Sequence, residues 1–253
     1  MQKKIFRTVE DYILSKDIDI VNHIPFDKKD FSRINSKTII EQLKLISKFH
    51  KRIKNCNRCT LQRIENQTGK IVELQKVDLG KCKKILRDIE NSNSKNDFES
   101  MLVNYGKEFL RIGEKSIEEI YISGYIDIIV RSMDNNEICI GDPYFNNLAY
   151  ENNRIQIKNI NKISYNIVEI DAFNLLNKLS RKGIKLPISY LAGEFCEFEG
   201  LGEKSQKLIE ALMKYPYDFV RYCNRYKKNK KYDNDKCVEK LKDIMNIYSS
   251  EVI

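Results

Sequence analysis

Apolar residues recur at helical spacing along most of the chain. From Ser36, which can cap a helix, apolar side chains follow one another every three or four residues as far as Ile53. This pattern predicts a helix buried along one face. A second helical stretch over 79–89 ends in a polar linker at 91–96. Further helices are predicted from Asn96 or Asp97 to a break at Gly124, and over 125–133, 169–179, 188–198, 203–214, 216–228 and 234–248, the last capped by Asp233 or Asn234.

The period changes near the middle of the chain. Short apolar runs at 138–140 and 147–150 are typical of strands, and residues 154–158 alternate between polar and apolar. The turn at 151–153 joins the last two runs into a predicted hairpin, and a loop is expected at 160–166. Residues 1–35 show weak periodicity and a few short elements. The expected fold class is therefore α+β, mainly helical, with a small central β-hairpin region.

Composition and charge reduce the number of possible functions. The chain has 253 residues, 42% of them hydrophobic, and a net charge of +9. This length suits one large domain or two small ones, and the apolar content excludes wholesale disorder. No apolar run approaches the roughly 20 residues that span a bilayer, so no membrane role is expected. The basic excess is spread along the chain, with its densest run at 225–231, so nucleic-acid binding is only a third alternative.

Seven cysteines are scattered along the chain. An odd number without a secretory signal indicates reduced thiols in a cytoplasm. Cys56 and Cys59 form a C-x-x-C pair, with His50 upstream and Cys82 further on, and four such ligands could hold zinc. Because a second C-x-x-C pair is lacking, ordinary thiols are the favoured interpretation.

The segment between the first two predicted strands is the strongest candidate for chemistry. It contains Gly141, Asp142 and, five residues after the aspartate, Asn147. In phosphoryl transfer, an aspartate in such a loop orients the attacking hydroxyl, and the asparagine binds Mg²⁺. A simpler alternative stays open, because Gly-Asp-Pro is also ordinary turn chemistry and Asn147 can be a plain loop residue.

The loop resembles a known catalytic motif. Gly141-Asp142 followed by Asn147 is similar to the His-Gly-Asp-x-x-x-x-Asn loop of the aminoglycoside phosphotransferase and choline kinase group, which has the protein-kinase-like fold. The flanks resemble one branch of that group, the spore coat protein S (CotS) family, at 45–51, at 96–99 and at 215–226. The resemblance runs from about residue 36 to residue 248. It implies an N-terminal extension at 1–35 and a kinase-like C-terminal lobe at 36–253.

Three departures from the family pattern suggest that activity has been lost. Ile140 stands where the family has histidine, and its side chain cannot make the hydrogen bonds that brace the loop. Asn159 stands where the family has the aspartate that binds Mg²⁺, and an amide oxygen is a weaker ligand. No N-terminal lobe, Gly-rich loop or phosphate-binding lysine is recognisable. Asp142 is thus expected to be a vestigial base, and Asn147 and Asn159 vestigial Mg²⁺ ligands.

Asp171 is expected to support the loop, as a helix-start residue bonded to the loop backbone. The resemblance as a whole implies a truncated pseudokinase of the spore coat, with a structural or interaction role in coat assembly and no cofactor. It would occur in the mother-cell cytoplasm and the coat, with other coat proteins as partners. The alternative is an ATP- and Mg²⁺-dependent phosphotransferase that acts on a small hydroxylated substrate.

Overall fold

The chain folds into two compact units, which are described here one at a time. The computed structural model describes residues 5–26, 33–54, 60, 62–228, 238–239 and 241–245. The first unit comprises residues 1–69 and 121–213, and the second comprises residues 70–120 and 214–253. The second unit is therefore formed by an insertion into the first unit together with the C-terminal part of the chain.

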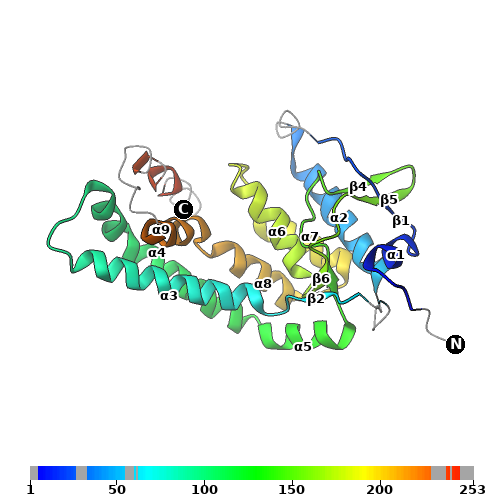
Figure 1. The fold of residues 1–253 in the computed structure, drawn as a ribbon, viewed down its shortest axis with the longest axis horizontal. Coiled ribbons are helices and arrows are strands. Elements are labelled where there is room, and N and C mark those ends of the chain that lie inside the picture. The colour runs from blue at the N-terminus through cyan, green and yellow to red at the C-terminus, as the bar shows by residue number, and fades with distance from the viewer. Residues whose placement is uncertain are drawn as a thin grey trace. The chain divides into compact units, whose positions relative to one another are not determined.

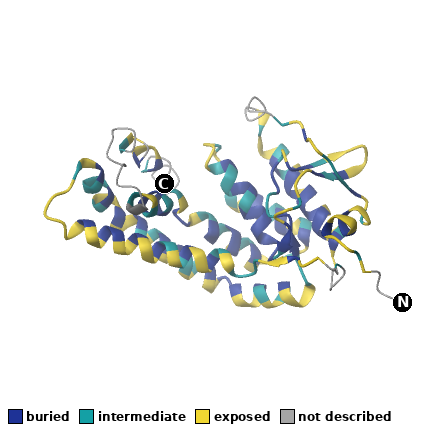
Figure 2. Cartoon of the chain, viewed as in Figure 1, coloured by how far each residue is buried: buried dark blue, intermediate teal, exposed yellow. Residues whose placement is uncertain are grey.

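Helices make up most of the first unit (Figure 1). The central helix α2 packs against α6 and α7, and the sides that these helices turn toward each other are buried (Figure 2). Their bounds agree closely with the predicted helices, because an apolar face at helical spacing is a strong signal. The helices of this unit are α1 (Val9–Leu14), α2 (Ser36–Ile53), α5 (Tyr125–Asn135), α6 (Glu169–Ser180), α7 (Ile188–Glu199) and α8 (Glu203–Lys214).

The cap of α2 differs from the prediction. Asn35, not Ser36, is the N-cap residue, and Ser36 is the first residue of the helix. The Asn35 side chain accepts a hydrogen bond from the backbone N–H of Thr38 at 3.1 Å, and the Thr38 hydroxyl accepts one from the Asn35 N–H at 3.0 Å. Asn35 takes this place because its backbone is extended, with φ −136°, which turns its side chain back toward the first turn.

Two three-stranded sheets lie in the first unit. One has the order β1 (Ile18–Ile20), β5 (Arg154–Ile157) and β4 (Leu148–Glu151), and the other has the order β2 (Glu65–Asn66), β6 (Ser164–Tyr165) and β3 (Ile138–Cys139). The predicted hairpin is confirmed as β4 and β5, which pair antiparallel through a turn at Asn152 and Asn153. Strand β6 falls in the segment predicted as a loop at 160–166, and no strand was predicted at β2, because two residues are too few to show a period.

The N-terminal residues contribute to the core of the first unit. Tyr12 and Ile13 of α1 and Ile18 of β1 are buried in the same apolar cluster as α2 and β5. Strand β1 pairs parallel with β5, with Ile18 opposite Ile155. The predicted domain boundary at residue 35 stays a prediction, but the described residues before it are part of this core.

The second unit is helical in its described part. It contains α3 (Lys70–Glu90), most of α4 (Asp97–Ile122), α9 (Tyr217–Lys228) and a helical segment at 241–245. Asn96 caps α4, since its side-chain oxygen accepts the Glu99 N–H at 2.8 Å. The predicted caps Asp233 and Asn234 lie outside the described residues. Within the described part of the chain, no helix combines the length and apolarity needed to cross a bilayer.

Candidate functional site

The predicted catalytic loop connects the two sheets of the first unit. It leaves β3 at Gly141 and enters β4 after Asn147. Gly141 has φ +76°, and a Cβ atom there would clash with the backbone carbonyl oxygen of Lys162. Glycine is therefore required at this position by both the backbone conformation and the close approach of the neighbouring segment.

Asp171 holds the start of the loop. It lies in the first turn of α6 with its side chain completely buried. Its carboxylate accepts hydrogen bonds from the backbone N–H groups of Ile140 at 2.6 Å and Gly141 at 2.9 Å. The Ile140 side chain itself is buried in the core, so this position is braced through its backbone although it lacks a polar side chain.

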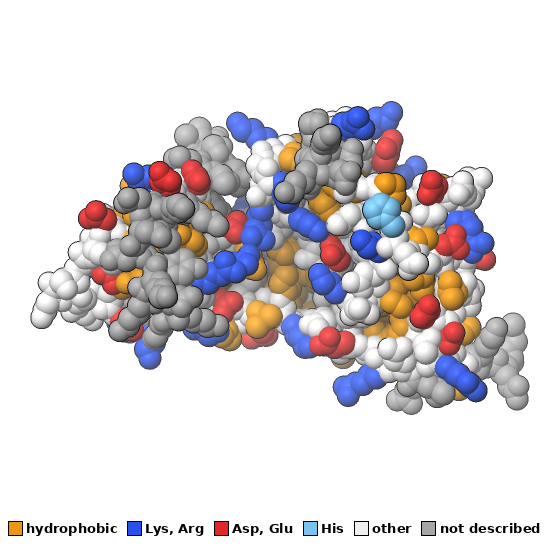
Figure 3. Space-filling model, turned by 45° about the horizontal axis from the view of Figure 1, so that its top comes forward, with side chains coloured by type: hydrophobic (Ala, Val, Ile, Leu, Met, Phe, Trp, Pro, Cys, Tyr) orange, Lys and Arg blue, Asp and Glu red, His pale blue; other side chains and the backbone are white. Residues whose placement is uncertain are grey.

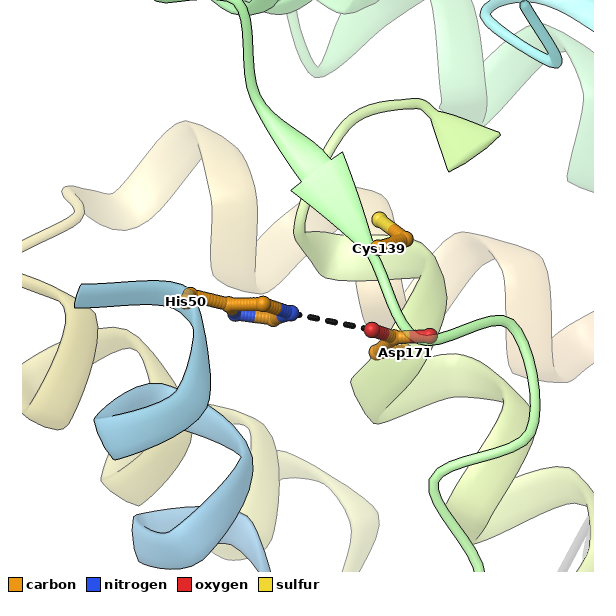
Figure 4. A group of neighbouring side chains, drawn as sticks. All are labelled: His50, Cys139 and Asp171. Carbon is orange, nitrogen blue, oxygen red and sulfur yellow. Dashed lines mark hydrogen bonds and ion pairs between the residues drawn. The ribbon is translucent and has the colours of Figure 1, made fainter. Parts of the chain in front are cut away.

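His50 on α2 points toward Asp171 (Figure 4) and also contacts a second buried carboxylate. Its Nε2 lies 2.9 Å from Asp171 Oδ2, and its Nδ1 lies 2.7 Å from Glu199 Oε1 on α7. Burial alone lowers the pKa of His50, but the hydrogen bonds and charges of the two carboxylates outweigh it and raise this pKa to about 10. At neutral pH the side chain is thus an imidazolium that donates both N–H groups.

This cluster is not suited to hold a metal ion. His50, Cys139 and Asp171 offer ligand atoms within 4.8 Å of one another (Figure 4). Both nitrogens of His50 carry protons that the carboxylates accept, so neither has a free lone pair. Burial and the charge of Asp171 raise the pKa of the Cys139 thiol, whose Sγ–H donates to the Ile167 carbonyl at 3.1 Å. To bind a metal ion, the cysteine would have to be a thiolate and the histidine a neutral imidazole. The cluster is therefore better described as a hydrogen-bonded network that supports the start of the loop.

Asp142 lies between two lysine side chains. Lys162 Nζ is 3.4 Å from one carboxylate oxygen and Lys178 Nζ is 3.4 Å from the other. Lys178 also lies 3.9 Å from the centre of the Tyr144 ring, a cation–π contact that holds the ammonium group in place. The carboxylate is therefore neutralised by protein cations on both sides.

Asn147 and Asn159 lie beside Asp142, and their side chains form hydrogen bonds with backbone groups of this region. Asn147 Nδ2 donates to the carbonyl of Asp142 at 2.8 Å, and Asn147 Oδ1 accepts the Asn159 N–H at 2.7 Å. Asn159 Oδ1 accepts the N–H of Asn161 at 2.8 Å. The structure thus brings together the three predicted positions. The donor set fits Mg²⁺ poorly, because the carboxylate is ion-paired and both amide oxygens accept backbone hydrogen bonds.

The sequence does not reveal the partners of these residues. From the sequence, His50 is a possible zinc ligand, and Glu199, Lys162 and Lys178 belong to no motif. One signal was present, since a histidine on the apolar face of a predicted helix needs a buried polar partner. Cys56 and Cys59 lie outside the described residues, so the zinc site stays a prediction.

Comparison with known proteins identifies the fold. No protein-family model and no curated protein sequence matches the chain. The crystal structure of an aminoglycoside phosphotransferase from Alicyclobacillus acidocaldarius superposes with a TM-score of 0.67 and 12% sequence identity. The match covers 92% of this chain and 65% of that one. The chain has an aminoglycoside phosphotransferase-like fold. The predicted mainly helical α+β class is thus confirmed. The predicted kinase-like fold is confirmed as an aminoglycoside phosphotransferase-like fold.

Proposed function

We propose that this chain is a kinase-like protein without phosphotransferase activity that acts as a structural or interaction component. The observation that carries the proposal is the pairing of Asp142 with Lys162 and Lys178. Two ammonium groups beside the carboxylate compete with Mg²⁺ for its oxygens, and phosphoryl transfer needs that metal ion.

The neutral side chain at position 159 supports the same proposal. Transition-state stabilisation in phosphoryl transfer is mostly electrostatic, and the metal ions supply much of it. Replacing a metal-binding carboxylate by the amide of Asn159 is expected to lower the rate by several powers of ten, about 4 kcal/mol or more. The Asn159 amide oxygen also accepts the Asn161 N–H, so its capacity as a ligand is reduced further.

The cellular role in the proposal is a component of the spore coat. Its support is the sequence resemblance to the spore coat protein S family at 45–51, 96–99 and 215–226. The proposal places the protein in the mother-cell cytoplasm and then in the coat, bound to other coat proteins, and treats residues 36–253 as a C-terminal kinase-like lobe. Antibodies against the chain should detect it in the extracted coat of purified spores. Its confinement to vegetative cells would contradict this role.

An active phosphotransferase is the second candidate. It is favoured by the fold and by the rigid support that Asp171 gives to the loop before Asp142. Under this alternative, ATP and Mg²⁺ would bind, Asp142 would be the base, and the substrate would be a small hydroxylated molecule. Another polypeptide or a further segment would have to complete the nucleotide site.

A thermal-shift titration with ATP and Mg²⁺ or Mn²⁺ separates the two candidates. A ligand at a hundred times its dissociation constant stabilises a protein by about 2.7 kcal/mol, which is readily measured as a higher melting temperature. We expect no shift with either metal and no ATP turnover above background. The same titration on Asp142→Ala, with the exposed Asp134→Ala as the matched control, should give the same result. A metal-dependent shift or turnover that only Asp142→Ala removes would establish the enzyme instead.

A further inference from the structure

A cavity in the first unit lies outside the predicted catalytic residues. It has a volume of about 720 Å³ and lies between α2, the hairpin of β4 and β5, and the described residues that precede α2. Neither Asp142 nor Asn147 lines it. Small-molecule sites in proteins typically measure about 300–1,000 Å³ and are lined mainly by apolar side chains with a few polar groups. The cavity has the size of such a site.

The walls of the cavity are apolar and partly aromatic. Ile24 and Leu45 are buried, as is Leu148 at the start of β4. The ring of Phe26 stacks on that of Phe145, with centroids 5.2 Å apart and planes 14° from parallel. Stacked rings at the wall form a flat apolar surface, which favours a ligand whose body is planar and apolar.

Gln42 supplies a fixed polar group at the cavity. Its side chain is only 6% exposed. Its Nε2 donates to the carbonyls of Pro143 at 3.0 Å and Leu148 at 3.1 Å, and these two acceptors determine which way the amide is turned. Oε1 has no hydrogen-bond partner among the described residues. This oxygen can therefore accept a hydrogen bond from a ligand that carries an N–H or O–H donor.

Cationic side chains border the cavity. Lys44 and Lys48 lie one turn apart on α2, and Arg33 lies just before that helix, whereas the acidic residues of the lining are Glu41 and Glu151. The described residues of the lining therefore carry a net positive charge. Lys48 is held over the Tyr150 ring, 4.6 Å from its centre, so this cation keeps its place beside the cavity.

We propose that this cavity binds a small amphipathic anion with a planar apolar body. A hydrogen-bond donor of the ligand meets Gln42 Oε1, and its anionic group lies toward Lys44 and Lys48. The site does not depend on whether the protein transfers phosphate, because Asp142, Asn147 and Asn159 do not line it, although Phe145 of the same loop does.

The dye 1-anilinonaphthalene-8-sulfonate is a suitable probe, because it combines an aromatic body, an N–H donor and a sulfonate. Fluorescence titration of the native protein should show saturable binding of a single dye molecule per chain. Ala149→Trp on β4 fills the cavity and should weaken binding by about tenfold or more. Val130→Ser changes an apolar residue of α5 that is 51% exposed, and as the matched control it should leave binding unchanged.

The neutral analogue N-phenyl-1-naphthylamine tests the charged part of the proposal. It has the same body and N–H group but no sulfonate, so it should bind several-fold more weakly than the sulfonate dye. The double variant Lys44→Met/Lys48→Met should abolish this difference. Circular dichroism and melting temperature verify that each variant is folded, and Ala149→Leu replaces Ala149→Trp if the larger side chain prevents folding.

Three results would overturn the proposal. Dye binding that is unchanged in both Ala149 variants, or that is lost in Val130→Ser, would place the dye on an exposed apolar surface and not in the cavity. Equal affinity for the charged and neutral dyes would exclude an anion as the ligand class.

Discussion

At the scale of single residues, the two aspartates predicted for the site have different surroundings. Asp171 is completely buried and accepts hydrogen bonds from two backbone N–H groups and from His50. The side chain of Asp142 is 32% exposed and is paired with two lysines that are themselves exposed to solvent. Asp171 therefore bears on the stability of the loop, whereas Asp142 could matter only through chemistry or a ligand.

This difference predicts that the same substitution changes the stability of the protein by very different amounts at the two aspartates. Asp171→Asn should lower the free energy of unfolding by about 3–5 kcal/mol, because it removes a charge from a buried ion pair and turns a donor toward other donors. Asp142→Asn should change this free energy by less than about 1 kcal/mol, as is usual for solvent-screened pairs. Urea unfolding of both variants measures the contrast, and equal losses would contradict it.

His50 predicts a pH dependence of stability. Its pKa is raised in the folded protein to about 10 from an ordinary value of 6.5. A raised pKa means that the folded state binds the proton more tightly than the unfolded state. The stabilisation from His50 is therefore fully present below about pH 6.5 and is lost as the pH rises to about 10.

Melting temperatures across this range test the sign. The advantage of the native protein over His50→Gln should be largest near pH 6 and should shrink toward pH 10. His23→Gln is the matched control, because His23 is exposed and should give a pH profile parallel to that of the native protein. An advantage over His50→Gln that grows with pH would show that His50 is neutral in the folded state.

At the scale of elements, two glycines of α4 make room for leucine side chains of α3. A Cβ atom at Gly106 of α4 would lie 2.5 Å from Leu86 Cδ1 of α3, and one at Gly113 would lie 2.7 Å from Leu79 Cδ1. Leu86 and Leu79 are buried in the core of this unit. A larger residue at either glycine would therefore have to displace a buried leucine.

Substitution of helical glycines separates packing from helix propensity. Gly80→Ala on α3 has open space around the added methyl group and should stabilise the protein by about 0.5–1 kcal/mol through helix propensity. Gly106→Ala has the same propensity gain but must displace Leu86, an overpacking cost of about 1–3 kcal/mol. Urea unfolding should therefore rank Gly80→Ala above Gly106→Ala, and equal stabilisation would mean that Leu86 moves away at no cost.

The elements differ in how well the sequence predicts them. The long helices follow from their apolar faces, and the hairpin of β4 and β5 follows from its alternation and its turn. Strands β2 and β6 are too short to carry a period and exist because β2 pairs with β6, which pairs with β3. The brace of His50 with Glu199 joins residues 149 positions apart, and Lys178 lies 36 positions from Asp142, so neither contact has a local signal.

At the scale of the whole molecule, knowing the fold does not determine the function. The likeness to an aminoglycoside phosphotransferase at 12% identity identifies the fold, and the function has to be argued from the site. The chain has a net charge of +9, and acidic side chains also occur on the face drawn in Figure 3. A net charge well away from zero favours colloidal solubility.

The pairing of β1 with β5 has a consequence for self-association. In the sheet that contains them, β5 has β4 on one edge and β1 on the other, so its backbone groups are paired within the chain. A variant without β1 would leave the backbone groups along one edge of β5 unpaired. The apolar residues Ile155 and Ile157 of β5 lie on this edge. Open edges of this kind are templates for strand addition by another molecule. The short N-terminal strand therefore covers this edge of β5 as well as adding to the core.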